Sequence, residues 1–195
     1  MRITGGIYGR RQIVVPKGEC RPTQDVVRGA LFSIIGERIC GCRFLDLFAG
    51  SGTVGLEALS RGADLVCWVE SNRKTMITLK ENVERICCKD GDMAHKVRFF
   101  GGDVFSFLQK GLENQQFDLI FADPPYDREA EKGWLPRLFK VLGDGNVLAP
   151  GGVFVMEQAS EEDSCENIDW ALVKDKVYGG TRLRFFVRKE KGGCL

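Results

Sequence analysis

The chain has 195 residues, of which 44% are hydrophobic and 28% are charged. These fractions are ordinary for a globular protein, and the length predicts one domain with a small appendage, which excludes a wholly disordered or fibrous chain. The opening residues MRITGGIYGR contain no apolar core of a secretory signal, and no apolar run approaches the roughly 20 residues that span a bilayer. We therefore expect a cytoplasmic protein with no membrane association.

The pattern of cysteine and histidine argues against metal chemistry. Eight cysteines are present without a Cys-x-x-Cys pair, and His95 is the only histidine. A zinc site would need a tighter cluster of ligands, so we expect no metal. A hydrolase built on Ser-His or Cys-His would depend entirely on His95. Reduced thiols, as in most cytosolic proteins, are the expected state of the cysteines.

The net charge of +1 hides an uneven distribution. Residues 1–43 carry eight Lys or Arg against three Asp or Glu, and residues 174–191 carry seven against two. Two basic ends can present a surface for an anionic partner, and they can equally be solvated faces. Composition leaves both interpretations open.

The first 42 residues predict a hairpin followed by a helix. Residues 2–7 and 11–15 have the composition of short strands, and Gly9 lies between them as a turn residue. Thr23 can cap a helix that ends at Gly36 or Gly41. Its expected apolar face comprises Val26, Val27, Ala30, Leu31, Ile34 and Ile35.

From Arg43 onward, strands alternate with helices. Such alternation predicts a mostly parallel sheet covered by helices on both faces, and the last two strands, joined by Gly179-Gly180, predict an antiparallel hairpin at one edge. We therefore predict a Rossmann-like α/β domain over 43–195, preceded by a small hairpin-and-helix extension over 1–42. The expected strands are 44–48, 65–69, 96–100, 117–122, 152–158, 170–174 and 183–188, and the expected helices are 53–61, 72–88, 104–110 and 127–142.

A glycine loop follows the first of these strands. Gly50, Gly52 and Gly55 form a G-x-G-x-x-G pattern between strand and helix. Glycines allow backbone N–H groups to approach a ligand, and the helix N-terminus favours a negative group. Glu70 lies about 20 residues further on, at the tip of the next strand, where a carboxylate can accept hydrogen bonds from ribose hydroxyls. A dinucleotide site shares these features.

Two further acids favour a different nucleotide-like cofactor. Asp46 precedes the loop, where a carboxylate would help to hold a cationic amino-acid group rather than a pyrophosphate. Asp103 follows the next strand, where it can contact an adenine amino group, cap the helix over 104–110, or do both.

A second motif, Asp123-Pro124-Pro125-Tyr126, follows the strand over 117–122. The prolines fix the backbone, so a carbonyl can point outward beside the carboxylate. Two acceptors match the two N–H donors of an exocyclic amine, and Tyr126 offers a face for base stacking. Contact with two acceptors returns electron density to the poorly nucleophilic amine nitrogen. The alternative interpretation of this motif is a rigid turn after the strand, and the neighbouring glycine loop argues against it.

These motifs together resemble those of S-adenosylmethionine-dependent amino-methyltransferases. DLFAGSGTVGLEALSRGA and DPPY carry that resemblance, and MRITGGIYGR, RPTQD, VRGALFSII and YGGTRLRFF narrow it to the RsmD family. The resemblance spans nearly the whole chain. It implies a class I methyltransferase fold with a seven-stranded sheet, S-adenosyl-L-methionine as cofactor, and methylation of the exocyclic N2 of a guanine in 16S ribosomal RNA.

The resemblance also implies a role for particular residues. Asp46, Gly50, Gly52, Glu70 and Asp103 would bind the cofactor, and Asp123, Pro124 and Tyr126 would engage the guanine. Contacts to RNA would come from Arg2, Arg10, Arg11, Arg21, Thr23 and Arg28. The substrate would be the small ribosomal subunit or its assembly intermediate, and we expect a monomer.

The expected reaction is direct in-line transfer of the methyl group to N2, with the proton leaving to Asp123 or to water. The target base must be unstacked to reach such a pocket. Three alternatives remain open at this point: an amino-methyltransferase acting on adenine N6 of DNA, a nicotinamide-dependent dehydrogenase, and an RNA-binding module without turnover.

Overall fold

The computed structural model describes residues 1–15, 23–87, 93–110, 115–125, 131–161 and 167–189. Within these ranges the longest helix has 15 residues, and no helix is long and apolar enough to cross a membrane. The strands are β1 (Arg43–Leu47), β2 (Leu65–Glu70), β3 (Val97–Gly101), β4 (Phe117–Ala122), β5 (Leu148–Ala159), β6 (Trp170–Tyr178) and β7 (Thr181–Arg188). The helices are α1 (Thr23–Ile35), α2 (Thr53–Ser60), α3 (Arg73–Cys87), α4 (Met93–Lys96), α5 (Val104–Lys110) and α6 (Glu131–Asp144), with a 3₁₀ turn over Gly36–Ile39.

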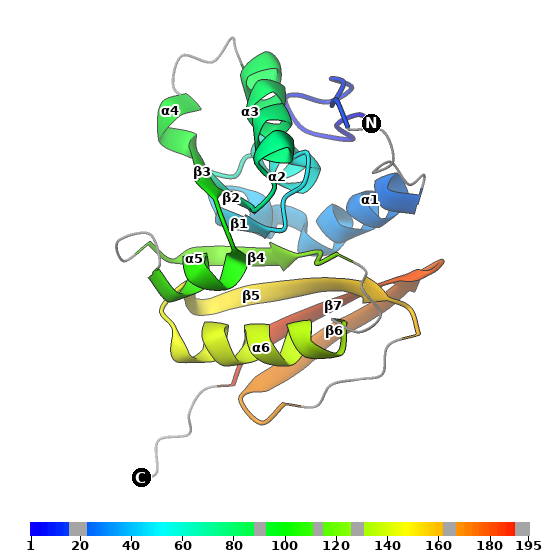
Figure 1. Ribbon diagram of the computed structural model, residues 1–195. Helices are drawn as coiled ribbons and strands as arrows, with labels where there is room; N and C mark the ends of the chain where they lie inside the picture. Colours follow the sequence, from blue (N-terminus) through cyan, green and yellow to red (C-terminus); the bar gives the residue numbers. More distant parts are fainter. Residues whose placement is uncertain (16–22, 88–92, 111–114, 126–130, 162–166, 190–195) are drawn as a thin grey trace.

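The described strands form one sheet in the order β3-β2-β1-β4-β5-β7-β6. Strands β1 to β5 pair in parallel, whereas β7 is antiparallel to both β5 and β6. The predicted Rossmann-like sheet with an antiparallel hairpin at its C-terminal edge is therefore confirmed (Figure 1). In such sheets ligands bind at the carboxyl ends of the strands, where the strand order reverses. Here that position lies between β1 and β4.

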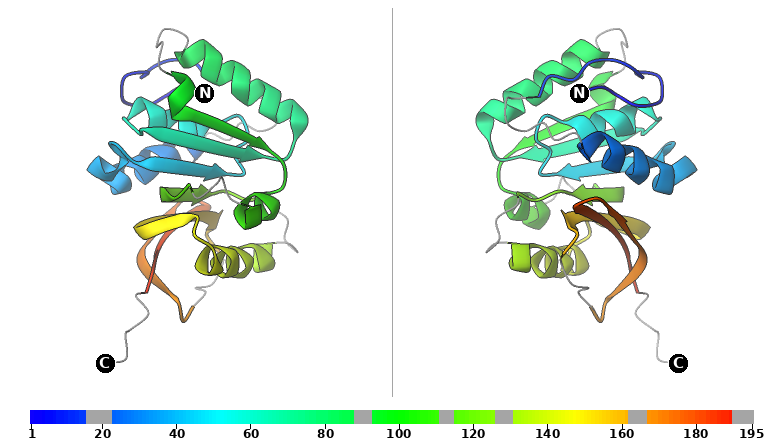
Figure 2. Two further views of the ribbon diagram at one scale, coloured as in Figure 1. Left: turned by 90° about the vertical axis from the view of Figure 1, so that its left-hand side faces the viewer. Right: turned by 90° about the vertical axis from the view of Figure 1, so that its right-hand side faces the viewer.

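Helices cover both faces of the sheet, as Figures 1 and 2 show. On one face, α1, α2 and α3 pack on the sheet around a core that includes Leu31, Leu56, Leu79 and Phe121. On the other face, α5 and α6 enclose a second core. We refer to these as the α1–α3 face and the α5–α6 face. Because side chains alternate along a strand, each position of the sheet belongs to one face or the other.

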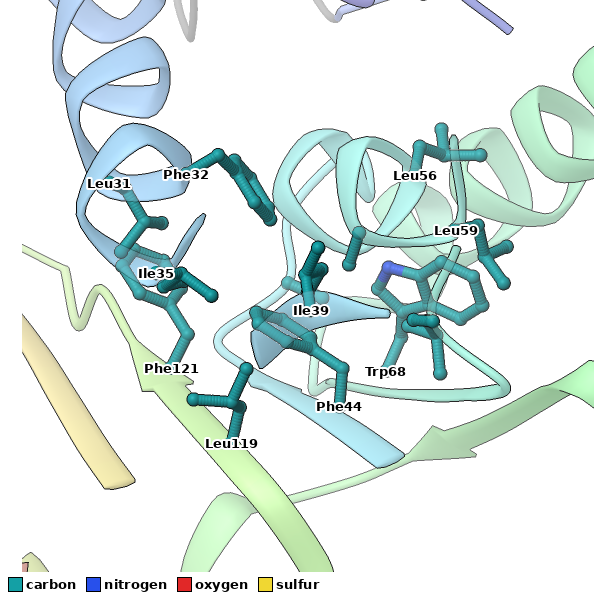
Figure 3. Packing of buried hydrophobic residues seen from close by; sticks show 14 of the residues in the cluster. Leu31, Phe32, Ile35, Ile39, Phe44, Leu56, Leu59, Trp68, Leu119 and Phe121 are labelled. Carbon is teal, nitrogen blue, oxygen red and sulfur yellow. The ribbon is translucent and has the colours of Figure 1, made fainter. Parts of the chain in front are cut away.

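Aromatic and branched side chains fill the core on the α1–α3 face. Figure 3 shows Ile35 of α1 beside Phe121 of β4, and Leu59 of α2 beside Trp68 of β2. Trp68 is fully buried and its ring lies 5.3 Å from that of Phe99. Trp68 therefore packs in the core of the protein.

The N-terminal extension differs in detail from the prediction. The expected strands over 2–7 and 11–15 reduce to one antiparallel bridge, Arg2 with Gln12. Near the bridge the backbone still bonds across the hairpin, through the Ile3 amide and the Arg11 carbonyl at 3.0 Å. Toward the tip the amides bond to α2 instead: the Ile7 amide donates to the Ser60 carbonyl at 2.8 Å and the Tyr8 amide to the Ser60 hydroxyl at 2.9 Å.

Helix α1 also presents a different apolar face from the expected one. Val26 is 63% exposed, whereas Phe32 joins Val27, Leu31 and Ile35 among the buried residues. The helix ends at Ile35, directly before Gly36, which is one of the two predicted endpoints. The short helix α4 was not predicted.

Cys40, Cys42 and Cys67 are free thiols. Cys42 and Cys67 are buried in the core, and burial raises the pKa of each to about 12. They stay protonated at neutral pH, and a thiol in that form is a weak nucleophile.

A buried carboxylate ties the extension to the sheet domain. Glu57 of α2 is fully buried and accepts hydrogen bonds from the Thr4 amide at 2.8 Å, the Thr4 hydroxyl at 2.6 Å and the Gly5 amide at 2.9 Å. Its oxygens also lie 3.4 Å from the guanidinium of Arg28 and 2.8 Å from that of Arg61. Residues 1–15 and α1 therefore share a core and an ionic network with the sheet domain. The boundary predicted at residue 42 stays a prediction.

This network makes Glu57 a determinant of stability. We expect Glu57→Gln to lower the free energy of unfolding by about 3 kcal/mol, because the buried Arg28 guanidinium then keeps only the half-exposed Asp25 as a carboxylate partner. Urea denaturation measures the change. The exposed Glu84→Gln on α3 is the matched control and should alter stability by less than about 0.5 kcal/mol. Equal stability of the two variants would contradict the assigned role.

Candidate functional site

A cavity of about 790 Å³ lies at the carboxyl ends of the parallel strands. Both motifs border it: the glycine loop contributes residues 48–51, 53 and 54, and the loop after β4 contributes residues 123–125. Glu70 at the end of β2 and Asp103 before α5 line the same cavity. Further walls come from the N-terminal segment, α1, α6, β5 and the start of β7, through Met1, Val15, Arg28, Leu31, Trp134, Glu157, Gly180 and Thr181.

The conformation and packing of the glycine loop require glycine at two positions, Gly52 and Gly55. Gly52 has a φ of 81°, a left-handed conformation that favours glycine. At Gly55, an added Cβ would lie 2.2 Å from the indole nitrogen of Trp68, so the absence of a side chain allows α2 to pack directly on β2. Phe48 has a φ of 62°, which is strained for a non-glycine residue. The loop thus turns sharply from β1 into α2.

Asp46, predicted to bind the cofactor, is the last polar side chain of β1 before this turn. It is 2% exposed, and its carboxyl accepts a hydrogen bond from the Gly55 amide at 2.9 Å. Burial raises the pKa of Asp46 to about 8, and the nearby carboxylates of Asp123 and Glu70 act in the same direction. This shift favours the protonated form of Asp46 at neutral pH. A cationic ligand group placed beside it would favour the charged form.

Glu70 and Asp103 present oxygens to the cavity while also shaping its loops. Glu70 accepts the Gly50 amide at 2.9 Å and the Asn72 amide at 2.6 Å, and a carboxylate has further lone pairs for ribose hydroxyls. Oδ1 of Asp103 caps α5 by accepting the Ser106 amide at 2.9 Å. Oδ2 makes no hydrogen bond within the described ranges, so the predicted double role of Asp103 is geometrically open.

The second motif stands beside the first because β1 and β4 are neighbours. Asp46 pairs with Phe121 in the parallel register, so the loop after β4 begins level with the loop after β1. Asp123 is partly buried, Pro124 is buried and Pro125 is exposed, and all three line the cavity. Tyr126 lies outside the described residues.

Aromatic rings form another wall of the cavity. The Trp134 ring meets Phe48 edge-on at 5.0 Å and stacks on Phe105 at 5.5 Å. The Arg137 guanidinium lies 3.9 Å from the centre of the Phe105 ring. Stacked in this way, Trp134 is held in place at the boundary between α6 and the cavity.

The residues predicted to contact RNA have different surroundings. Arg2 and Arg10 are exposed, whereas Arg11 donates to the Ile86 carbonyl and covers the Tyr8 ring. Arg28 is 3% exposed and pairs with Asp25 at 3.0 Å in addition to Glu57, so it faces protein and the cavity rather than solvent. Arg21 and the side chain of Thr23 lie outside the described residues. The RNA-binding roles stay predictions.

Several cavity residues carry no motif that sequence reasoning detects. Trp134 lies in an ordinary amphipathic helix, and Glu157 lies inside a mostly apolar strand. The charge of Glu157 within that strand was the available signal. Thr181 follows Gly179-Gly180, a pair from which the sequence predicts only a turn between two strands.

Comparisons with known proteins agree with this geometry. The family described as conserved hypothetical protein 95 matches residues 1–187. "Ribosomal RNA small subunit methyltransferase D" of Escherichia coli K12 is 33% identical over 98% of this chain and 92% of its own length, and the protein of that name from Buchnera aphidicola of Acyrthosiphon pisum is 29% identical over 90% and 86%. A solved Escherichia coli structure, named as the methyltransferase yhhF, superposes with a TM-score of 0.82 at 30% identity, covering 98% of this chain and 99% of that one.

The raised pKa of Asp46 predicts a distinct pH dependence of stability. Between the unfolded pKa near 3.9 and the folded pKa of about 8, the native state holds one proton more than the unfolded state, so stability falls as pH rises. Asp46→Asn removes this loss. The stability of the variant relative to the unchanged protein should rise by about 1.4 kcal/mol per pH unit between about pH 5 and pH 7.

Chemical denaturation at several pH values measures this difference, and Asp144→Asn, at an exposed position of α6, serves as the control that should follow the unchanged protein. Parallel pH profiles for Asp46→Asn and the unchanged protein would show that Asp46 is already ionised at neutral pH.

Proposed function

The chain belongs to the family described as conserved hypothetical protein 95, the RsmD family, and from that premise we propose that it transfers a methyl group from S-adenosyl-L-methionine to N2 of a guanine in 16S ribosomal RNA. The observation that carries the proposal is the shared cavity. One end is bounded by the glycine loop, Glu70 and Asp103, and another by Asp123 and its two prolines. A methyl donor and an amine acceptor held there would lie side by side.

The chemistry of the cavity residues fits the cofactor. A volume of about 790 Å³ lies within the range of roughly 300–1,000 Å³ typical of small-molecule sites. Gly50 lines it, and a Cβ added there would meet no atom within 4 Å, so the missing side chain leaves room for a ligand. Glu70 would hold the ribose, Asp103 the adenine, and Asp46 and the loop the methionine part. When bound, the cofactor supplies an electrophilic methyl group.

The residues after β4 would prepare the acceptor. The Asp123 carboxylate and the Pro124 carbonyl each accept one N–H of the guanine amine, which orients the nitrogen and raises its electron density. The prolines limit backbone motion, so the acceptors are held in place before the base arrives. The proton released from the amine leaves to Asp123 or to water.

The relatives support RNA as the substrate class. The two relatives compared above are named for methylation of small-subunit ribosomal RNA, which does not favour DNA adenine or a nicotinamide cofactor. We expect the enzyme to act in the cytoplasm, as a monomer, on the small subunit or an assembly intermediate. The exposed Arg2 and Arg10 would contact phosphates, with contributions from Arg11, Arg21 and Thr23. Arg28 is 3% exposed, so any contact of its guanidinium with RNA would have to be made through the cavity that it lines.

Removal of the Asp123 carboxylate tests the proposal directly. Small ribosomal subunits from cells lacking the protein are incubated with methyl-labelled cofactor, and the RNA is digested to nucleosides. We expect N2-methylguanosine with the unchanged protein and a rate lower by about 100-fold or more with Asp123→Ala, because the amine loses an acceptor that orients it.

The exposed Asp144→Ala, at the far end of α6, should methylate at the unchanged rate. Binding of S-adenosylhomocysteine by Asp123→Ala, measured by calorimetry, shows that the fold is kept. A label found only in duplex DNA added to a parallel reaction would overturn the proposed substrate, and full activity of Asp123→Ala would overturn the proposed role.

Trp134 should report cofactor binding. Trp68 and Trp170 are at most 3% exposed and lie in the two cores, whereas Trp134 lines the cavity. S-adenosylhomocysteine should therefore change the intrinsic fluorescence mainly through Trp134. In Trp134→Phe, which keeps an aromatic ring against Phe105, most of this change should disappear while calorimetry still detects binding. A full fluorescence response in that variant would place the ligand elsewhere.

A further inference from the structure

Glu157 occupies a position beside the second motif that the proposed reaction does not use. Ala122 pairs with Met156 in the parallel register of β4 and β5, so Asp123, the first residue after β4, follows Ala122 as Glu157 of β5 follows Met156. Hydrogen-bonded strands lie about 4.8 Å apart, so the two residues are close neighbours. Glu157 is partly buried and lines the cavity.

The alternation of β5 fixes the direction of this side chain. Val153 and Val155 belong to the core on the α1–α3 face, and Phe154 and Met156 belong to the core on the α5–α6 face. Glu157 follows Val155 at a spacing of two and therefore lies on the α1–α3 face. Leu31 of α1 borders the cavity on that side, so Glu157 stands across an open space rather than inside the core.

The second motif alone does not distinguish one base from another. Guanine, adenine and cytosine all carry an exocyclic amine, and each amine offers N–H donors to Asp123 and the Pro124 carbonyl. The bases differ at the ring nitrogen beside the amine on the Watson–Crick edge. Guanine has a hydrogen-bond donor there, N1–H, whereas adenine N1 and cytosine N3 carry lone pairs. A residue that contacts this ring position can therefore select guanine.

We propose that the Glu157 carboxylate accepts the N1–H of the target guanine and thereby selects guanine over other amine-bearing bases, an inference that rests on the proposed function. A carboxylate beside Asp123 is suited to this because it only accepts hydrogen bonds when ionised. A base with a lone pair at the ring nitrogen would place two acceptors face to face. Sites built around a specific hydrogen bond reject analogues that lack it.

Thr181, at the start of β7, offers a hydrogen-bond donor beside the acceptor of Glu157. Thr181 lines the cavity and pairs with Ala159, one step beyond Glu157 on the same face of the sheet. Its hydroxyl can donate a hydrogen bond, and guanine carries an acceptor, O6, next to N1–H. Glu157 and Thr181 together therefore present an acceptor and a donor in the order that the guanine edge requires.

Two variants test the proposal. Glu157→Ala removes the acceptor and should lower kcat/KM for guanine in the small subunit by about 100-fold. Glu157→Gln introduces an amide that can turn either its oxygen or its N–H toward the ring nitrogen, so it should accept both kinds of base. Glu161→Gln is the matched control, because Glu161 is exposed just beyond β5 and outside the cavity lining.

The decisive substrate carries 2-aminopurine at the methylated position, within small subunits reconstituted with that RNA. This base keeps the exocyclic amine but has a lone pair at N1. For the unchanged protein and for Glu161→Gln, kcat/KM should favour guanine over 2-aminopurine by about 100-fold or more. For Glu157→Gln the ratio should fall toward one. A purely structural role would lower both rates together and leave the ratio unchanged.

Calorimetric binding of S-adenosylhomocysteine within about threefold of the unchanged protein shows that the variants are folded. An unaltered preference for guanine in Glu157→Gln, or full guanine activity in Glu157→Ala, overturns the inference while leaving the proposed function intact. If the unchanged protein forms no N2-methylguanosine, the proposed function fails, and the role of Glu157 fails with it.

Discussion

The parallel pairing of β1 with β4 is the constraint on which the site depends. Both strands end at the same edge of the sheet, and the register Leu47 with Ala122 sets the two loops at one level. A shift of one residue would turn Asp123 from the α1–α3 face to the α5–α6 face, because successive side chains point to opposite faces. The glycine loop and the acidic loop would then no longer share a cavity. Strand register, rather than either motif alone, therefore creates the site.

Two buried carboxylates show how the same chemical group serves different purposes. Glu57 is surrounded by backbone amides, a hydroxyl and two guanidinium groups, so its charge is compensated and it fastens the N-terminal segment. Asp46 has one amide and two acidic neighbours, and its pKa is raised to about 8. Because Met1, Val15 and Arg28 line the cavity, the network of Glu57 also holds one wall of the site. Stability and site geometry are thus coupled through α2.

The sequence allowed the sheet domain to be predicted almost completely, since period-two and period-3.6 patterns are strong there and the motif loops lie at strand ends. The extension was harder, because the amides of Thr4, Gly5, Ile7 and Tyr8 donate to α2, a partner that local pattern does not reveal. The exposure of Val26 and the burial of Arg28 have the same origin, as tertiary contacts decide which face of α1 is covered. The sequence did not predict that Trp134 and Glu157 line the cavity, because their position there depends on neighbouring strands and helices that are distant in sequence.

The distribution of charge in the folded chain bears on two kinds of binding, that of a base inside the cavity and that of phosphates outside it. The acidic residues Asp46, Asp123 and Glu157 line the cavity, and the two basic segments of the sequence also reach it, through Met1, Val15, Gly180 and Thr181. An acidic interior favours a cationic donor and an amine, and it disfavours phosphate. Under the proposed function, basic side chains of these segments would bind the RNA phosphates outside the cavity while one unstacked base enters. Recognition of that base would then come from the cavity wall, where Glu157 of β5 lies beside Asp123, the residue that follows β4.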